Sequence, residues 1–157
     1  MSVPLKVEAL GHVSLFVKDL EASVRFYRDV LGLKDVGRGK AGRIAFFSAG
    51  PHHHDLSLEL ARADGPERPR GAPGLYHIAF QVGTTREALD AARRWVEAHG
   101  LGPFGEMNAG ASASFSIHDP DGHEIELYVD LRPGGPTRQI AAIPPRSATT
   151  TKPKAQR

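Results

Sequence analysis

Hydrophobic and polar residues alternate in two short runs of this chain, and each run leads into a helical pattern. The runs are "HVSLFV" (12–17) and "HIAFQV" (77–82), and a period of two is typical of a strand with one buried face. After the first run, apolar residues recur on one helical face at Leu20, Val24, Tyr27 and Leu31. Each run is therefore predicted to be a strand that leads directly into a helix.

Capping residues mark the helix boundaries in both patterns. Asp19 is placed to cap the N-terminus of the first helix, and Gly32 stands where helices end in a left-handed residue. Thr84–Glu87 has the form of a capping box for the second helix, and Gly100 supplies its end. These signals predict two helices at corresponding places in two similar halves.

Each helix is followed by three more strand-like segments, which makes both halves βαβββ. We expect module one at about residues 7–61, a linker at 62–74 and module two at about 75–130. The prediction is a single α+β domain over residues 1–132, with paired βαβββ modules forming a cupped mixed sheet, helices outside and a concave cavity inside. The predicted segments are Lys34–Gly37, Arg43–Ser48, His54–Ala61, Phe104–Met107, Ala113–His118 and Glu124–Val129.

Composition narrows the possible partners. The chain has 157 residues, a net charge of +2 and no cysteine. The small charge and scattered basic residues argue against nucleic acid, and the lack of cysteine excludes disulfides and thiolate metal ligands. No apolar run is long enough for a membrane span or a signal peptide, so a cytoplasmic protein with no membrane partner is expected. Residues 133–157 are rich in Pro, Thr and basic residues and are predicted to be a flexible tail.

Strand alternation places four candidate metal ligands on the cavity side of the predicted sheet. In the two opening strands, the helix-facing residues leave His12 and His77 on the opposite face. Glu59 in "SLEL" matches Glu126 in "EIEL" when the two halves are superposed. Two imidazoles and two carboxylates suit Zn, Ni, Mn or Fe(II), and two His with one Glu would form the facial triad of non-haem iron oxygenases.

The duplicated pattern, with a His in each opening strand and "DPDGHEIELY" (119–128) near the end, resembles the vicinal oxygen chelate superfamily. The resemblance covers about residues 7–130. This superfamily includes glyoxalase I, extradiol ring-cleavage dioxygenases, methylmalonyl-CoA epimerase, fosfomycin-resistance enzymes and metal-free bleomycin-binding proteins. It implies a small-molecule substrate and a homodimer in which module one of one chain completes the cavity of module two of its partner. A chain that folds its own two modules together is the alternative.

Within this superfamily, "HHHDLSLEL" (52–60) is similar to catechol-type extradiol dioxygenases. That resemblance implies that His12, His77 and Glu126 hold Fe(II) or Mn(II), while His54 is a second-sphere histidine that handles protons and O₂. The chain departs from the pattern at Ser116, where those enzymes usually carry a tyrosine ahead of the DPDG motif. The first functional hypothesis is accordingly an extradiol-type oxygenase of a small aromatic or vicinal diol.

Two other hypotheses remain open. Glyoxalase I is similar in taking four ligands from these positions, which implies Glu59 as fourth ligand and base, with Ni(II) or Zn(II) as the ion. Phe16 departs from that pattern, because an arginine that contacts glutathione is expected there. The third hypothesis is a metal-free protein that binds a small molecule, such as a drug, in an aromatic cavity.

The histidine triplet (52–54) is not expected to be the metal centre itself. His52 and His53 are interpreted as loop residues. His54 shares its parity with Leu56 and Leu58, which face the helix, so it reaches the cavity only if the strand starts after it or contains a bulge. We expect the metal ligands to come from elsewhere in the chain.

Overall fold

The computed structural model describes residues 5–50, 52–66, 69 and 71–133. The predicted tail lies outside these residues, apart from Pro133. No helix in the described part of the chain is long and apolar enough to span a bilayer.

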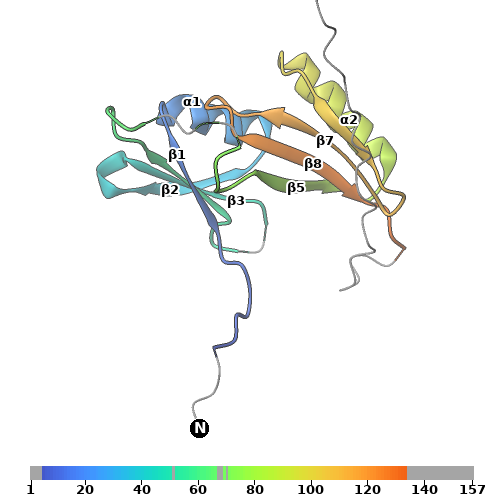
Figure 1. The fold of residues 1–157 in the computed structure, drawn as a ribbon, viewed down its shortest axis with the longest axis horizontal. Coiled ribbons are helices and arrows are strands. Elements are labelled where there is room, and N and C mark those ends of the chain that lie inside the picture. Colours follow the sequence, from blue (N-terminus) through green and yellow to red (C-terminus); the bar gives the residue numbers. More distant parts are fainter. Residues whose placement is uncertain (1–4, 51, 67–68, 70, 134–157) are drawn as a thin grey trace, which may run out of the picture.

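Two modules follow each other along the chain, and each opens with a strand and a helix (Figure 1). Every predicted strand is present, with boundaries that differ by at most two residues. Module one contains β1 (Val13–Val17), α1 (Leu20–Arg25), a π-helical turn (Phe26–Val30), β2 (Lys34–Gly39), a 3₁₀ turn (Lys40–Gly42), β3 (Ile44–Ser48) and β4 (Leu56–Leu60). Module two contains β5 (His77–Gly83), α2 (Arg86–Ala98), β6 (Phe104–Asn108), β7 (Ser112–His118) and β8 (Glu124–Asp130).

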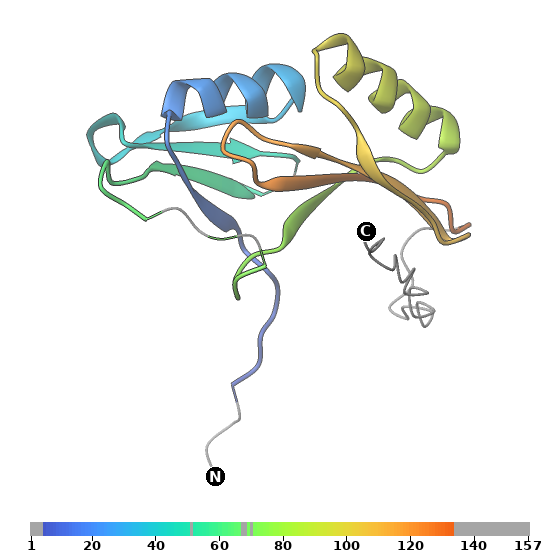
Figure 2. The same ribbon diagram turned by 45° about the horizontal axis from the view of Figure 1, so that its top comes forward.

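The two modules have the same sheet topology, which confirms the α+β fold of repeated βαβββ units. The strand order is β1-β4-β3-β2 in one four-stranded sheet and β5-β8-β7-β6 in the other. In each sheet the opening strand is parallel to the closing strand, and the other described pairs are antiparallel. The two sheets stand side by side with both helices on the same side (Figure 2). The opening strands β1 and β5 each lie at an edge.

Local chemistry accounts for the helix boundaries. The Asp19 side chain accepts a hydrogen bond from Ala22 N at 2.9 Å, as an N-cap does, and Gly32 follows the helical segment with φ of 72°. In α2 the cap is Thr85, whose hydroxyl accepts from Ala88 N at 3.3 Å. The capping box predicted from Thr84 is therefore one residue early. Gly100, with φ of 75°, ends α2 as expected.

The core lies between the sheets and their helices, as the alternation predicts. Leu15, Leu58 and Leu127 are buried against the helix layer, while Phe16 on the other face of β1 is 68% exposed. Burial of side chains on one face only is what a half-buried sheet with period-two patterning produces. The open faces of the two sheets carry the residues that remain for function.

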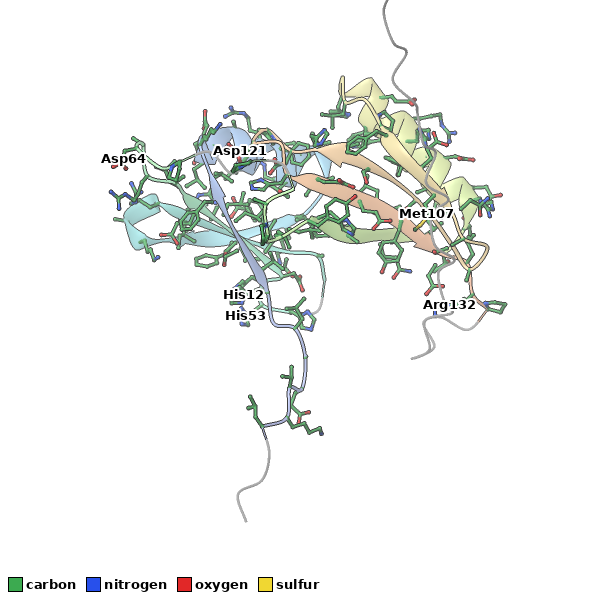
Figure 3. All side chains as sticks on the ribbon, in the orientation of Figure 1. His12, His53, Asp64, Met107, Asp121 and Arg132 are labelled. Carbon is green, nitrogen blue, oxygen red and sulfur yellow. The ribbon has the colours of Figure 1, made fainter. Side chains whose placement is uncertain are left out.

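A set of hydrogen bonds, here called the module lock, joins the two modules. The Tyr27 hydroxyl donates to Asp119 Oδ2 at 2.9 Å, and both side chains are buried. Asp121, in the same β7–β8 turn, accepts from the backbone N–H of Lys18 at 3.1 Å and lies beside α1 in Figure 3. The Trp95 indole N–H donates to the Val30 carbonyl at 2.8 Å. These contacts hold the DPDG turn and α2 of module two against α1 and the π-helical turn of module one.

Candidate metal centre

Module two brings together a histidine and a carboxylate. His77 opens β5, and the register pairs Ala79 with Glu126, so the Glu126 side chain lies diagonally across from His77 on the open face. His77 Nε2 and Glu126 Oε2 are 3.3 Å apart. Two donors bound to one ion at about 2.1 Å are roughly 3.0–3.4 Å apart at angles between octahedral and tetrahedral. The pair has the spacing of two ligands of one ion.

The His77 ring is incompletely satisfied within its own chain. Its Nδ1 atom is buried and has no hydrogen-bond partner among the described residues. A buried ring nitrogen without a partner is costly, and metal-binding histidines usually have the second nitrogen hydrogen-bonded. Module two therefore presents two donors that fit a metal ion but does not complete their surroundings.

Module one brings two histidines together in the corresponding region. β4 begins at Leu56, after His54, so the strand starts late enough for His54 to leave the helix-facing parity. The ring centroids of His12 and His54 are 4.5 Å apart, and Phe46 contacts His54 at 5.1 Å. Partial burial, with contributions from His53 and His12, lowers the pKa of His54. The neutral imidazole is therefore favoured near neutral pH.

The other two histidines of the triplet have different surroundings. His52 Nδ1 lies 2.7 Å from Asp55 Oδ1, which ties it to the loop before β4. His53 packs on His54 with ring centroids 4.2 Å apart, and Figure 3 shows His53 and His12 at the same end of the sheet. His53 therefore lies next to the candidate site, although the sequence indicated only a loop residue at this position. No pattern in the sequence distinguishes it from His52.

The strand register corrects the superposition of Glu59 on Glu126. Because Val13 pairs with Leu56 and Ile78 pairs with Ile125, the residue at the Glu126 position in module one is Ser57. Glu59 pairs with Phe16, which corresponds to the pairing of Tyr128 with Gln81. The similarity between "SLEL" and "EIEL" is displaced by two residues relative to the strand pairing.

Both residues at these positions of β4 already have partners. The Ser57 hydroxyl hydrogen-bonds to Ser14 Oγ at 2.5 Å and is buried. The Glu59 carboxylate accepts from Lys40 Nζ at 2.8 and 3.0 Å. Glu59 as a metal ligand stays a prediction, and to bind an ion it would first have to exchange Lys40 for that ion.

The two half-sites do not merge within one chain. Among the described residues, no three His, Asp or Glu side chains are grouped so that they could hold a metal ion. His77 and Glu126 form one half, and His12 with His54 forms the other. The module lock holds the two halves in their present relation, so the ligand set that the sequence predicts is split.

Apart from Ser116, which the sequence marks as a departure from the dioxygenase pattern, the other side chains on the open face of module two were not singled out from the sequence. The Ser116 hydroxyl donates to Glu124 Oε1 at 2.9 Å, and the rings of Phe104 and His118 stack at 4.4 Å. Tyr128 follows Glu126 on the same face of β8, because side chains alternate along a strand. Alternation could have placed these residues on the open face, although not their contacts with each other.

The fold and these side chains define a class: duplicated βαβββ chains with histidine and carboxylate side chains on the open faces of their sheets. The family model described as the Glyoxalase/Bleomycin resistance protein/Dioxygenase superfamily matches residues 9–127. The chain belongs to this superfamily.

The related proteins in this superfamily catalyse different reactions. The chain is 32% identical to "Glutathione transferase FosA" of Serratia marcescens over 78% of this chain and 82% of that protein. It is 31% identical to "Biphenyl-2,3-diol 1,2-dioxygenase 3" of Rhodococcus globerulus over 77% of this chain but 63% of that protein. It is 30% identical to "Lactoylglutathione lyase" of Salmonella typhimurium over 75% of this chain and 90% of that protein. The similarity supports an enzyme with a divalent metal without defining the reaction.

Solved structures agree on the architecture. The "Lactoylglutathione lyase from Agrobacterium tumefaciens" superposes with a TM-score of 0.60 at 29% identity, over 78% of this chain and 94% of that one. A "glyoxalase/dioxygenase from Nostoc punctiforme" superposes with a TM-score of 0.69 at 23% identity, over 83% and 96%. The second likeness concerns the fold alone.

Proposed function

We propose that this protein is a metal-dependent oxygenase of the extradiol type that acts on a small aromatic vicinal diol. His12, His77 and Glu126 would hold Fe(II) or Mn(II), and His54 would be the acid–base group. The observation that carries the proposal is the position of His54. Its ring packs on His12, while the competing candidate Glu59 is paired with Lys40.

The proposed centre is shared between two copies of the chain. Each chain offers one half with His77 and Glu126 and one half with His12, and the module lock opposes their closure within the chain. In a symmetric homodimer the first half of one chain can meet the second half of the other, twice. Two complete centres then form without breaking the buried Tyr27–Asp119 hydrogen bond.

The bound metal and His54 would have different roles in the proposed reaction. Bound Fe(II) or Mn(II) would supply Lewis-acid and redox chemistry at a site that keeps open positions for reactants. Among the described residues, the ring of His54 contacts the rings of His12, His53 and Phe46. A neutral imidazole at this place can take a proton from a substrate hydroxyl and later return it.

The open faces suit a flat aromatic substrate. Phe16 lies on the open face of β1 and is 68% exposed, and Phe46 lies beside His54. Phe104 and Tyr128 stand on the open face of module two. Exposed rings on a concave face bind aromatic ligands through apolar burial and edge or face contacts. The name "Catechol-2,3-dioxygenase" of a Bacillus subtilis relative, 34% identical over 71% of this chain but 37% of that protein, points the same way.

A second candidate function is an isomerase or epimerase of the glyoxalase kind. Its support is length: the chain spans 90% of the lactoylglutathione lyase but 37% of the catechol dioxygenase. In this reading Glu59 leaves Lys40 and becomes fourth ligand and base, with Ni(II) or Zn(II) as the ion.

The deciding experiment combines metal analysis with two substitutions. Untagged protein prepared without chelators is analysed for metal per chain, and oxygen uptake with catechol is measured beside hemithioacetal isomerisation. In the oxygenase, His54→Ala keeps its metal and loses oxygen uptake, while Glu59→Ala keeps both. In the isomerase, Glu59→Ala loses metal and activity, while His54→Ala retains them. Protein that binds no metal even on reconstitution contradicts both readings and leaves the metal-free binding protein.

A further inference from the structure

Residues 5–11, here called the arm, lead into β1 and project away from the body of their own chain (Figures 1 and 2). Leu5 and Val7 are 96% and 79% exposed. Lys6 Nζ lies 3.2 Å from Glu8 Oε1, a contact between residues two apart that places both on one side of an extended backbone. Leu5 and Val7 therefore share the other side, which makes residues 5–8 amphipathic, whereas Leu10, which is 77% exposed, has the parity of Lys6 and Glu8.

The odd-numbered side of the arm has the same parity as the buried side of β1. Val13, Leu15 and Val17 point to the helix layer, and Leu5 and Val7 continue that series across Gly11. An apolar series of this kind is typical of a strand that packs on a helix layer. In its own chain the arm meets no helix layer, because it lies outside the fold.

Module two has a sheet edge and an apolar cavity that could bind the apolar side of the arm. Among the described residues β5 pairs only with β8, so its other edge presents unpaired backbone groups. A cavity of about 410 Å³ opens beside this edge on the helix side, and its apolar lining includes Phe80, Val82 and Trp95 of module two with Val30 and Leu33 of module one. An open edge next to an apolar cavity is a place where a further strand can add and bury its side chains.

We propose that the arm of one chain adds as an extra strand to the free edge of β5 in a second copy of the chain. The backbone of the arm then pairs with β5, and the side chain of Val7 lies against the cavity lined by Phe80, Val82 and Trp95, while Leu5 lies beyond the end of β5. The Lys6–Glu8 pair stays on the opposite side. The occupant is a second copy rather than the same chain, because the arm continues away from its own sheet and would have to reverse at Gly11 to return.

The register of this pairing rests on the proposed function, whereas the docking itself does not. A shared metal centre brings His12 next to His77 of the partner subunit. Five residues before His12 comes Val7, and five residues after His77 comes Val82. An antiparallel arrangement therefore places Val7 beside Val82 of the partner subunit. Both side chains have the parity of the helix-facing side, so they can meet on one face of the joined sheet.

Cysteine cross-linking tests the proposal directly, since the natural chain has no cysteine. One protein carries Val7→Cys and the other Val82→Cys, and the two are mixed, allowed to exchange subunits and oxidised. Residues directly opposite on neighbouring strands have the Cα separation that a disulfide needs. We expect a covalent dimer on non-reducing electrophoresis, formed from the mixture and not from either protein alone. The matched control pairs Lys6→Cys with Val82→Cys and should yield at least about tenfold less, because position 6 faces the other way.

The cross-linking result can be interpreted separately from the metal-binding result. A mixture that gives no more covalent dimer than the control overturns the proposal. A single chain that carries both Val7→Cys and Val82→Cys and forms the disulfide only within itself also overturns it. Folding is checked by circular dichroism of each variant. Cross-linking in protein that binds no metal would leave the arm inference standing and remove the proposed function. Metal binding without cross-linking would contradict the arm inference and leave the proposed function standing.

A second measurement covers the energetics. Leu5→Asp with Val7→Asp should raise the dimer dissociation constant at least about tenfold in sedimentation experiments, because charge on the apolar side of the arm opposes its burial. Lys6→Asp is the control, and it should leave the constant unchanged within about twofold. Equal constants for both variants contradict the proposal.

Discussion

The two modules share one topology and differ in what a single register position holds. In module two that position is Glu126, whose carboxylate lies 3.3 Å from the imidazole of His77. In module one it is Ser57, bonded to Ser14, and His12 has the imidazole of His54 as its neighbour instead. In the proposed centre the two halves of the duplicated scaffold therefore have different roles: one contributes a His and a carboxylate, and the other a His and an acid–base group.

The division of ligands between modules can be broken completely by substituting one ligand in each. His12→Ala and Glu126→Ala should each reduce metal content from about one ion to below about a tenth of an ion per chain, because each removes one of the three ligands of the proposed centre. Activity should fall at least about 1000-fold in each variant. Elemental analysis and turnover measure the two effects. Unchanged metal content in His12→Ala would remove module one from the centre.

Mixing these two inactive proteins sharpens the same comparison. Half of the exchanged dimers contain one chain of each kind, and in a shared arrangement one of their two centres has every ligand intact. Recovery of about a quarter of the wild-type activity is therefore expected after mixing. A centre formed within one chain would give no recovery, because each chain then lacks a ligand of its own.

The next effect concerns the residues that differ between the modules, His54 and Glu59. His54→Ala should lower kcat by about 100-fold or more and leave bound metal unchanged, since it removes an acid–base group and no ligand. Glu59→Gln should change kcat by less than about threefold, because its carboxylate is occupied by Lys40. Steady-state kinetics with metal analysis on the same samples distinguishes them. A Glu59→Gln protein without metal would instead favour the glyoxalase-like function.

Substitutions in the contacts between the modules should have smaller effects than substitutions of the proposed ligands. Their effects on the free energy of unfolding should still be measurable. Tyr27→Phe should lower the free energy of unfolding by about 1–2 kcal/mol, because the buried Asp119 loses one donor. Asp119→Asn should cost about 2–4 kcal/mol, since the carboxylate also accepts from the backbone N–H groups of Asp121 and His123. Urea denaturation measures both. Tyr76→Phe is the control, because Tyr76 is 70% exposed, and no change is expected there.

The carboxylate of Asp119 should also make the stability of the protein depend on pH. Burial alone raises the pKa of Asp119, but the bonds and charge of His123, with the bond from Tyr27, outweigh it and hold the pKa below its usual value. The unfolded chain therefore takes up this proton first, at about pH 4, and the contribution of Asp119 is full above that value. It is lost as the pH falls through the lower folded pKa. Urea midpoints between pH 6 and pH 3 should fall less steeply in Asp119→Asn than in the wild type.

The sequence predicted the features that depend on neighbours along the chain. Alternation in "HVSLFV" and "HIAFQV" fixed the buried and open faces, and Asp19 caps its helix as expected. The second helix starts one residue later than expected, because Thr85 rather than Thr84 is its N-cap. In both cases the decisive interactions span a few residues, which a single sequence displays.

Features that depend on distant pairing were not accessible in this way. The match of Glu59 with Glu126 compared similar letters, whereas the pairing of β1 with β4 is set by contacts more than forty residues apart. The late start of β4 was named as a condition for His54 and is present in the structure. The separation of the two half-sites follows from contacts between modules, and no local pattern records those.

The module lock also bears on the order in which the chain acquires its structure. Its hydrogen bonds join residues 65, 92 and 103 positions apart, whereas the strand pairs within a module join residues at most 47 positions apart. Closing a long loop costs more entropy than closing a short one, so the lock is expected to form after each module has organised. Weakening Tyr27 or Asp119 should then accelerate unfolding and leave refolding almost unchanged. The contact that orients the two half-sites is in this sense the last to form and the first to open.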